Sequence, residues 1–328
     1  MFEISKQDRQ VKDIPAVSVI VTAYKAAPYI AEALDSILAQ TFTDYEIIVV
    51  NDGSPDTREL ENALAPYLSR IIYIKQENQG TGAARNTGIR AARGQFIAIL
   101  DGDDLWEPEY LEVQLGVIEQ DPNVAVVYSN AVHFGGGDSV GRTFMDECPS
   151  EGEVTFESLL TERCNVFVSV TARREAIIAA GMFEEDRAMI GADDFDLWLR
   201  IVKQGRAIKY HRRPLVHHRS WKGQLSSDLV LFHRSIIRVL AKVESMQLTS
   251  EQKKILESRQ IYYRAMLNLF EGKAALFKGE TEKACQCLTD ANVFLKSRKV
   301  SLVIFLLHVA PWLFYATPVQ TLLASRNR

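Results

Sequence analysis

The sequence predicts an α/β fold with a doubly wound, mostly parallel β-sheet flanked by helices, followed by a C-terminal all-helical region. Two observations favour this fold. Apolar runs rich in Val and Ile alternate with helical patterns over the first hundred residues, as in sheets whose strands are buried on both faces. From residue 228 to 297 nearly every segment has helical periodicity. With 328 residues, 47% of them hydrophobic, the chain can bury a large core.

The first strands and helices follow one another from residue 16. Residues 16–24 form an apolar run, after which Pro28 opens a segment whose apolar residues recur at helical spacing. Residues 45–54 predict a second buried strand, and residues 71–76 and 94–100 predict two more, each preceded by a helix. In such sheets ligands bind beyond the carboxyl ends of the strands, so the polar residues that end these strands describe one pocket.

The predicted domain boundaries follow changes in this pattern. Residues 1–110 form one α/β half of a domain, and residues 111–227, with an α+β pattern, form its second half. Residues 228–297 are a helical region in which two amphipathic helices resemble a single tetratricopeptide-type pair. Residues 298–328 are an apolar segment flanked by cations.

The segment 300–324 is nearly free of charge and approaches the length of a membrane span, but Pro311 and Pro318 interrupt it. Three interpretations remain open. The segment is a pair of short helices that close a core, an interfacial anchor with cations on anionic lipid, or a true span.

Charge and cysteine content narrow the function classes. The net charge of −4 provides no basic field for nucleic acid, so we expect no nucleic-acid partner. The four cysteines lack zinc-type spacing and are interpreted as reduced cytosolic thiols. The polar N-terminus shows no apolar signal-peptide core, so we expect a cytoplasmic protein.

Three carboxylates within four residues follow the buried strand 94–100, at Asp101, Asp103 and Asp104 with Gly102 between them. Like charges this close raise one another's pKa unless something positive lies among them. Mg²⁺ or Mn²⁺ is commonly held by one or two carboxylates together with substrate phosphates. The alternative is a turn whose aspartates cap the helix that starts near Pro108.

Two further strand or loop ends carry polar residues. Asp52 could accept a hydrogen bond from a uracil ring on which Tyr24 stacks, with Thr22 nearby; the alternative is an Asx-type turn. Gly80 and Gly82 open a helix that carries Arg85, and a helix N-terminus after glycines favours anions. The spacing matches neither a Walker loop nor a dinucleotide fingerprint.

Two later segments carry reactive side chains. Asp193, Asp194 and Asp196 begin a helix, where acids are ordinary caps, but an acid beside a metal diphosphate could also deprotonate a hydroxyl. Residues 215–228 contain His217, His218, Arg219, Trp221 and Lys222, and the adjacent histidines point to opposite faces of a strand.

These motifs, in this order over residues 16–227, resemble the family 2 glycosyltransferases with the GT-A fold. The resemblance implies a nucleotide-diphosphate-sugar donor, usually a uridine one, and inversion at the anomeric carbon. The residues that it implies for donor binding are Thr22, Ala23, Tyr24, Asp52, Arg85, Asp101, Gly102 and Asp103. It further implies that Asp101 and Asp103 bind Mn²⁺ or Mg²⁺ as a DxD motif and that Asp194 is the catalytic base.

One departure from the family pattern concerns the segment after the last strand. Many relatives have Tyr-Arg-x-His there, whereas aligning His218-Arg219 with Tyr-Arg puts Trp221 at the histidine position. Either His217 or His218 takes the place of that histidine from a shifted register, or Arg219 and Lys222 neutralise the diphosphate. The further contacts to diphosphate, metal or acceptor that we expect come from Asp104, Asp193, His218, Arg219, Trp221 and Lys222.

The expected activity is transfer of a sugar from a UDP-sugar to a glycan or lipid-linked acceptor, in bacterial surface polysaccharide synthesis at the cytoplasmic face of the inner membrane. The alternative is a catalytically silent sugar-nucleotide-binding scaffold, which the presence of Asp103 and Asp194 disfavours. A nucleotidyltransferase would need a basic glycine-rich triphosphate loop, which residues 22–28 lack. A processive polymerase would show a Gln-x-x-Arg-Trp signature, which is not visible in the sequence.

Overall fold

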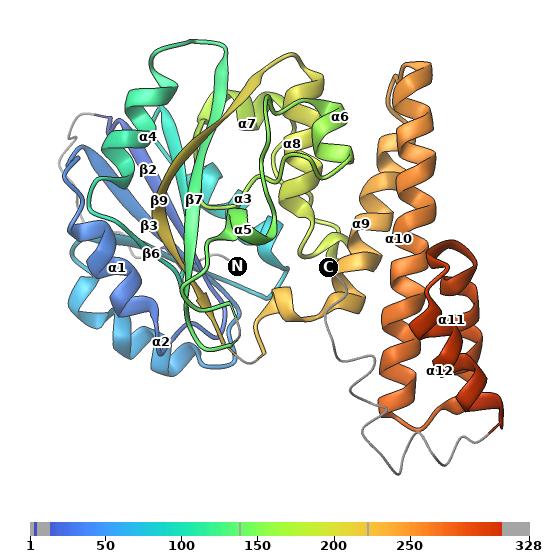
Figure 1. Ribbon diagram of the computed structural model, residues 1–328. Helices are drawn as coiled ribbons and strands as arrows, with labels where there is room; N and C mark the ends of the chain where they lie inside the picture. Colours follow the sequence, from blue (N-terminus) through green and yellow to red (C-terminus); the bar gives the residue numbers. More distant parts are fainter. Residues whose placement is uncertain (1–2, 5–13, 138, 222, 310–328) are drawn as a thin grey trace. The chain divides into compact units, whose positions relative to one another are not determined.

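The computed structural model describes residues 3–4, 14–137, 139–221 and 223–309. The chain divides into two compact units, Met1–Gln224 and Leu225–Arg328. The first unit contains a β-sheet with helices on both sides, and the second is helical (Figure 1). The predicted α/β fold with a helical C-terminal region is therefore confirmed.

Within the described residues, nine strands form one sheet in the order β1-β4-β3-β2-β5-β8-β7-β9-β6. The neighbours β4, β3, β2 and β5 are parallel, as the sequence predicts. The later strand β8 runs antiparallel to both β5 and β7, so the complete sheet is mixed. The strands are β1 Glu3–Ile4, β2 Val17–Ala23, β3 Tyr45–Asp52, β4 Ile71–Gln76, β5 Phe96–Asp101, β6 Leu105–Trp106, β7 Val124–Gly135, β8 Val170–Arg173 and β9 Ala207–Ser220.

The centre of the sheet is the core of the first unit. β2, β3 and β5 are apolar along both faces, and Val19, Ile48 and Ile99 are fully buried. Burial on both faces explains why these strands read as continuous Val/Ile runs in the sequence. The helices of this unit are α1 Ile30–Leu38, α2 Thr57–Leu64, α3 Thr81–Ala91, α4 Tyr110–Ile118, α5 Phe144–Glu147, α6 Phe156–Leu160, α7 Arg174–Ala179 and α8 Asp193–Lys203.

One close approach joins α3 to the chain that leads into α8. A Cβ atom added at Gly82 would lie 2.1 Å from the carbonyl oxygen of Glu184, far inside van der Waals contact. Only glycine lets the two backbones lie this close. The N-terminal turn of α3 therefore packs directly on the backbone next to α8.

The second unit contains α9 Leu229–Glu244, α10 Ser250–Phe277, α11 Thr281–Leu295 and α12 Arg298–Val309. Thr249 and Gln252 form a capping box at the start of α10. Its core joins α10, α11 and α12 through Leu269, Leu288 and Val303, among others. The predicted helix pair corresponds to α10 and α11, which a short connection around Gly279 separates.

Helix α12 is apolar on two faces. Val300, Val303 and Leu307 are buried in the core, whereas Leu302 and Phe305 are 48% and 60% exposed. No helix in the described ranges is both long and apolar enough to cross a bilayer. The remainder of the predicted apolar segment, residues 310–324, lies outside the described residues.

Candidate functional site

The carboxyl ends of β2 and β5 lie side by side and begin the candidate site. Thr22 is in register with Asp101, and its hydroxyl donates to Oδ1 of Asp101 at 2.9 Å. The N–H of Gly102 donates to the carbonyl of Thr22 at 2.9 Å, and a Cβ at Gly102 would lie 2.8 Å from that oxygen. Glycine at 102 thus lets the turn after β5 close against β2.

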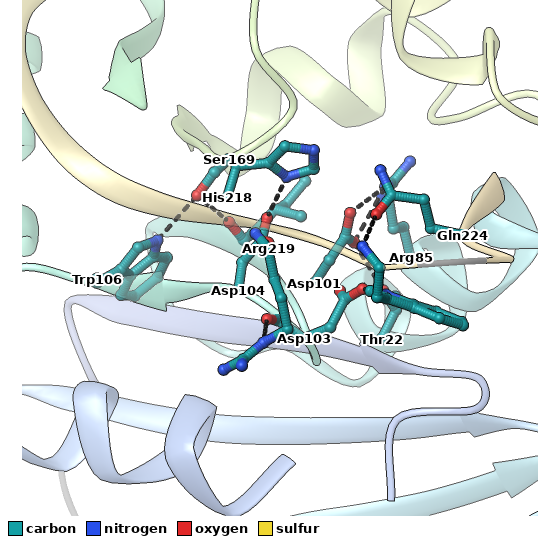
Figure 2. A network of polar contacts seen from close by, with 12 residues as sticks. Thr22, Arg85, Asp101, Asp103, Asp104, Trp106, Ser169, His218, Arg219 and Gln224 are labelled. Carbon is teal, nitrogen blue, oxygen red and sulfur yellow. Dashed lines mark hydrogen bonds and ion pairs between the residues drawn. The ribbon is translucent and has the colours of Figure 1, made fainter. Parts of the chain in front are cut away.

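Arg85 contacts two groups of acids, and Figure 2 shows it beside Asp101, a member of the first group. Its NH1 donates to Asp193 at 2.7 Å, and its NH2 donates to Asp101 at 3.2 Å. The guanidinium is buried; burial lowers its pKa, but the carboxylates of Asp101 and Asp193 outweigh this and raise it. We call Asp101, Asp103 and Asp104 the β5 acid cluster, and Asp193, Asp194 and Asp196 the α8 acid cluster. Arg85 therefore connects the two clusters with one positive charge.

Asp104 is the most buried member of the β5 acid cluster and contacts the end of β9. Its Oδ1 accepts from the backbone N–H of Arg219 at 2.8 Å, and its Oδ2 lies 3.2 Å from Nδ1 of His218. Burial lowers the pKa of His218, but the nearby Asp104 carboxylate reverses this and raises it to about 8. An imidazolium at neutral pH thus neutralises Asp104.

Asp103 has a different environment. Nε of Arg219 donates to its backbone carbonyl at 2.8 Å, and its carboxylate accepts from Nε1 of Trp221 at 2.7 Å. Burial, with repulsion from Asp104 and Asp101, raises the pKa of Asp103 to about 6. Within the described part of the chain, no cationic side chain forms an ion pair with this carboxylate. Among the described residues, the ionised form of Asp103 therefore has no ion-pair partner.

Two aromatic rings and one acid contact the guanidinium of Arg219. Its guanidinium lies 4.6 Å from the ring centroid of Tyr29 and 4.3 Å from that of Phe134, and it donates to Glu32 at 2.9 Å. Cation–π contacts on both sides restrict this side chain. These contacts consequently fix the position of Nε of Arg219, which donates to the carbonyl of Asp103.

The α8 acid cluster shows the same division between partnered and unpartnered acids. Asp193 accepts from Arg85 and from the hydroxyl of Thr81, and Asp196 pairs with Arg200 at 2.6 Å. Asp194 accepts only from the backbone N–H of Phe195, at 2.8 Å, among the described residues. Burial and the neighbouring Asp193 raise the pKa of Asp194 to about 7. A carboxyl that titrates near neutrality can accept a proton under physiological conditions.

Asp52 lies at the end of β3 but belongs to a separate network. Its carboxylate accepts from Gln76 at 2.7 Å, from Asn78 at 3.2 Å, and from the backbone N–H groups of Gln79 and Gly80 at 2.9 and 2.8 Å. These four donors order the loop before α3. The predicted contact of Asp52 with a base stays a prediction, because its acceptor positions are filled in this structure.

The remaining predicted residues lie as follows. Tyr24 is 48% exposed after β2, and Ala23 is buried in that strand. His217 pairs with Glu107 at 2.6 Å, on the face of β9 opposite to His218, as the alternation of a strand predicts. Lys222 lies outside the described residues. The structure thus brings together Thr22, Arg85, Asp101, Gly102, Asp103, Asp104, Asp193, Asp194, His218, Arg219 and Trp221.

The donor set of this site fits a divalent cation that substrate oxygens complete. Among the described residues, no three His, Cys, Asp or Glu side chains are grouped so that they would hold a metal ion by themselves. Mg²⁺ in nucleotide sites usually has only one or two carboxylate ligands, with phosphates and water as the others. Asp101 and Asp103 would serve as such ligands, and a bound cation would relieve the repulsion from Asp104 and Asp101 that, together with burial, raises the pKa of Asp103.

Several residues around the site have no signal in the sequence. Tyr29, Glu32 and Phe134 surround Arg219 although they are far from it along the chain. His133 is buried with its ring 5.2 Å from that of His218, and neither of its ring nitrogens has a hydrogen-bond partner. A pattern of residue types along one strand does not reveal such contacts, which depend on how β7 and β9 pair.

Comparisons with known proteins agree with this architecture. Residues 18–176 match the family model described as glycosyl transferase family 2. An uncharacterized glycosyltransferase of Rickettsia bellii is 29% identical over 92% of this chain and 43% of its own length. The chain spans about half the length of three curated Rickettsia relatives that it matches over 92%, 99% and 95% of its own length.

Solved structures share the fold. S. aureus TarS 1-349 in complex with UDP-GlcNAc has a TM-score of 0.62 and 20% identity, covering 94% of this chain and 90% of that one. The mannosyltransferase PcManGT from Pyrobaculum calidifontis, in complex with GDP-Man and Mn²⁺, has a TM-score of 0.60 and 20% identity, covering 94% and 85%. These likenesses show the same fold, a mixed sheet flanked by helices with a helical C-terminal region.

Proposed function

The chain belongs to glycosyl transferase family 2, and we propose that it transfers a sugar from a UDP-sugar to a hydroxyl group of a glycan or lipid-linked acceptor, with inversion at the anomeric carbon. It is accordingly a transferase enzyme. The observation that carries the proposal is the placement of Asp103 and Asp194. Each lacks an ionic partner among the described residues, and Arg85 joins the two acid clusters to which they belong.

The donor would bind at the ends of β2, β3 and β5. We assign the nucleoside to Thr22, Ala23, Tyr24 and Asp52, and the diphosphate to the turn at Gly102 and to Arg85. The Asp52 carboxylate would exchange one of its four present donors for the base. Exposure of the Tyr24 ring supports a stacking role, because a base could cover it. The UDP-GlcNAc and GDP-Man complexes of proteins with this fold support a nucleotide-sugar donor.

Asp101 and Asp103 would hold Mn²⁺ or Mg²⁺. When bound, the cation neutralises the charge that develops on the diphosphate leaving group. The Mn²⁺ complex of PcManGT supports this assignment. Asp104 and His218 neutralise each other and keep the turn in place beside these ligands.

Asp194 would accept the proton of the acceptor hydroxyl. The acceptor oxygen then forms a bond to the anomeric carbon, while the bond from that carbon to the diphosphate breaks and UDP leaves with the electron pair. A single displacement of this kind inverts the anomeric configuration. Asp193, held by Arg85 and Thr81, positions the helix turn that carries the base.

We also propose that the chain works at the cytoplasmic face of the inner membrane, on the acceptors of surface polysaccharide synthesis. From Ala291 to Arg328 the sequence has five Lys or Arg residues and no Asp or Glu. Helix α12 in this segment exposes Leu302, Phe305 and Val309. Apolar side chains beside cations are typical of a helix that binds anionic lipid at its surface.

A thermal-shift panel of nucleoside diphosphates and sugar nucleotides, each with and without Mn²⁺, tests the donor assignment. We expect UDP and one UDP-sugar to raise the melting temperature only with the cation, because ligands that bind the native state stabilise it. The preferred sugar nucleotide then enters a transfer assay, where the anomeric configuration of the product is read by NMR. A retained configuration, or no shift with any nucleotide, would refute the proposal.

Sedimentation with vesicles tests the membrane contact. The full chain should sediment with vesicles that contain phosphatidylglycerol and remain in the supernatant with phosphatidylcholine alone. Phe305→Ser should weaken sedimentation severalfold. Ile261→Ser is the matched control, because Ile261 on α10 is 52% exposed and lies outside the cationic segment. Equal loss in both variants, or none in either, would contradict the assignment to α12.

A further inference from the structure

Trp221 follows β9 and places its indole beside the β5 acid cluster. Nε1 donates to the carboxylate of Asp103 at 2.7 Å, and the Trp221 backbone N–H donates to Oε1 of Gln224 at 2.8 Å. The Trp221 ring centroid lies 6.0 Å from that of Tyr29, the ring that also contacts Arg219. The indole thus contacts both Tyr29 and Asp103. Its N–H donates to Asp103, the member of the β5 acid cluster that forms no ion pair among the described residues.

The chemistry of this N–H excludes Trp221 from metal ligation. An indole nitrogen is a donor only, whereas an imidazole nitrogen offers a lone pair to a metal ion. Nδ1 of the nearest histidine, His218, is already engaged with Asp104. Among the described residues, Asp101 and Asp103 are the side chains that we propose as ligands of a cation at this site, and the ligand atoms that they would offer are oxygens.

The position of Nε1 is nevertheless one that a ligand could occupy. Two ligands at right angles on an ion with bonds of 2.0–2.1 Å are about 3 Å apart. Nε1 of Trp221 lies 2.7 Å from Oδ2 of Asp103, close to that separation. The five-membered ring of indole and the imidazole ring have the same shape, so Nε2 of a histidine at 221 would fall near the place of Nε1.

We propose that Trp221 determines the cation selectivity of this site. Its N–H occupies the position from which a nitrogen lone pair would reach the cation, and it orients the Asp103 carboxylate without competing for the metal. Oxygen ligands suit Mg²⁺ as well as Mn²⁺, whereas an added imidazole favours the transition metal. The inference rests on the proposed cation-dependent donor site, and it states that Trp221 decides whether Mg²⁺ or Mn²⁺ binds there more tightly.

The test compares wild type, Trp221→His and Trp221→Phe, each titrated with Mg²⁺ and with Mn²⁺ in the presence of UDP. The readout is the ion concentration that gives half of the maximal thermal shift. In Trp221→His we expect the Mg²⁺-to-Mn²⁺ ratio of these concentrations to rise at least tenfold over wild type. Trp221→Phe removes the donor without adding a ligand, so both ions should weaken and their ratio should stay unchanged.

Pulsed EPR of bound Mn²⁺ provides a readout that does not depend on turnover. A coordinated imidazole nitrogen should appear in Trp221→His and be absent from wild type and from Trp221→Phe. If Trp221→His does not fold, the wild-type spectrum and the Trp221→Phe ratio still decide. A coordinated nitrogen in wild type, or a changed ratio in Trp221→Phe, overturns the proposal.

Failure of the proposed function gives a different result. If neither ion lets UDP raise the melting temperature of wild type, the cation-dependent donor site itself is refuted and the selectivity proposal falls with it. If both ions act on wild type and Trp221→His leaves their ratio unchanged, the selectivity proposal alone is refuted.

Discussion

The β5 and α8 acid clusters have the same composition, three aspartates within four residues, but they differ in how each charge is compensated. In the β5 acid cluster, Asp101 has Arg85 and Asp104 has His218, while Asp103 has the neutral indole of Trp221. In the α8 acid cluster, Asp193 shares Arg85 and Asp196 has Arg200, while Asp194 has a backbone N–H.

The comparison shows that each cluster leaves one acid that forms no ion pair among the described residues. Asp103 has a pKa of about 6 and contacts side chains of β9, so an incoming cation would relieve its repulsion with its neighbours. Asp194 has a pKa of about 7 at a helix N-terminus, so an incoming proton would do the same for it. Under the proposed function, the first of these acids would hold a metal ion and the second would accept a proton.

The largest expected effect comes from the residue that the clusters share. Arg85→Met leaves Asp101 and the buried Asp193 without their cation, and breaking a buried ion pair costs about 3–5 kcal/mol. Urea unfolding followed by tryptophan fluorescence should show this loss of stability. Arg90→Met is the matched control on the same helix, because the Arg90–Glu185 pair is exposed and should contribute less than about 1 kcal/mol. Equal stabilities of the two variants would show that Arg85 does not connect the clusters energetically.

The variant Asp194→Asn tests whether the transfer step can be lost while UDP binding is kept. We expect kcat for transfer to fall about 10³-fold, since a general base contributes roughly 10²–10⁴-fold. The cation-dependent UDP shift should remain, because the donor side is intact. The melting temperature without ligand should stay equal or rise, as the repulsion with Asp193 disappears. Activity within tenfold of wild type would remove Asp194 from the role of base.

Asp103→Asn, in contrast to Asp194→Asn, should weaken the cation-dependent binding of UDP. The cation-dependent component of UDP affinity should fall at least tenfold, in line with the roughly 1.5–3 kcal/mol of a contact to a charged group. Calorimetric titration of UDP with and without Mn²⁺ measures it. Glu107→Gln is the control, because Glu107 pairs with His217 on the other face of β9. A variant that still binds UDP in a Mn²⁺-dependent way would place the cation elsewhere.

The smallest expected effect is on stability as a function of pH. The folded-state pKa values of Asp103, Asp194 and His218 are all raised, to about 6, 7 and 8. Each group therefore binds its proton more tightly when folded, and each loses that stabilisation as pH rises through its folded pKa. The melting temperature of the ligand-free protein should fall by roughly 5 °C between pH 5 and 8.5.

The double variant Asp103→Asn/Asp194→Asn provides the comparison for this trend. It should show a flatter curve, with the decline confined to the range in which His218 titrates. A wild-type melting temperature that rises over the same pH range would contradict the compensation described for both clusters.

The fold could be predicted because its central strands are distinctive. Continuous Val/Ile runs such as 47–50 are buried on both faces, and few other structures accommodate a segment of that kind. The convergence of Thr22 and Asp101 at one edge follows from parallel pairing. The structure confirms this geometry, whereas the roles of these residues in binding remain predictions.

The partners of the acids could not be predicted from the sequence. Arg85 and Asp193 are 108 positions apart, and Trp221 and Asp103 are 118 apart. These pairs depend on the path of β7, β8 and β9, where the sequence pattern is irregular and the sheet becomes mixed. Asp52 illustrates the limit, because its sequence context allows a base contact or a turn, and only the loop from Gln76 to Gly80 shows which donors reach it.

The backbone contact at Gly82 has a consequence for how this molecule can evolve. With no side chain between α3 and the carbonyl of Glu184, the separation of α3 from the backbone at residue 184 is a dimension of the main chain. Substitutions accumulating on either element leave that dimension unchanged as long as residue 82 stays glycine. Any side chain at residue 82 would push α3 away from that carbonyl, so the packing of the helix that carries Arg85 depends on this one glycine.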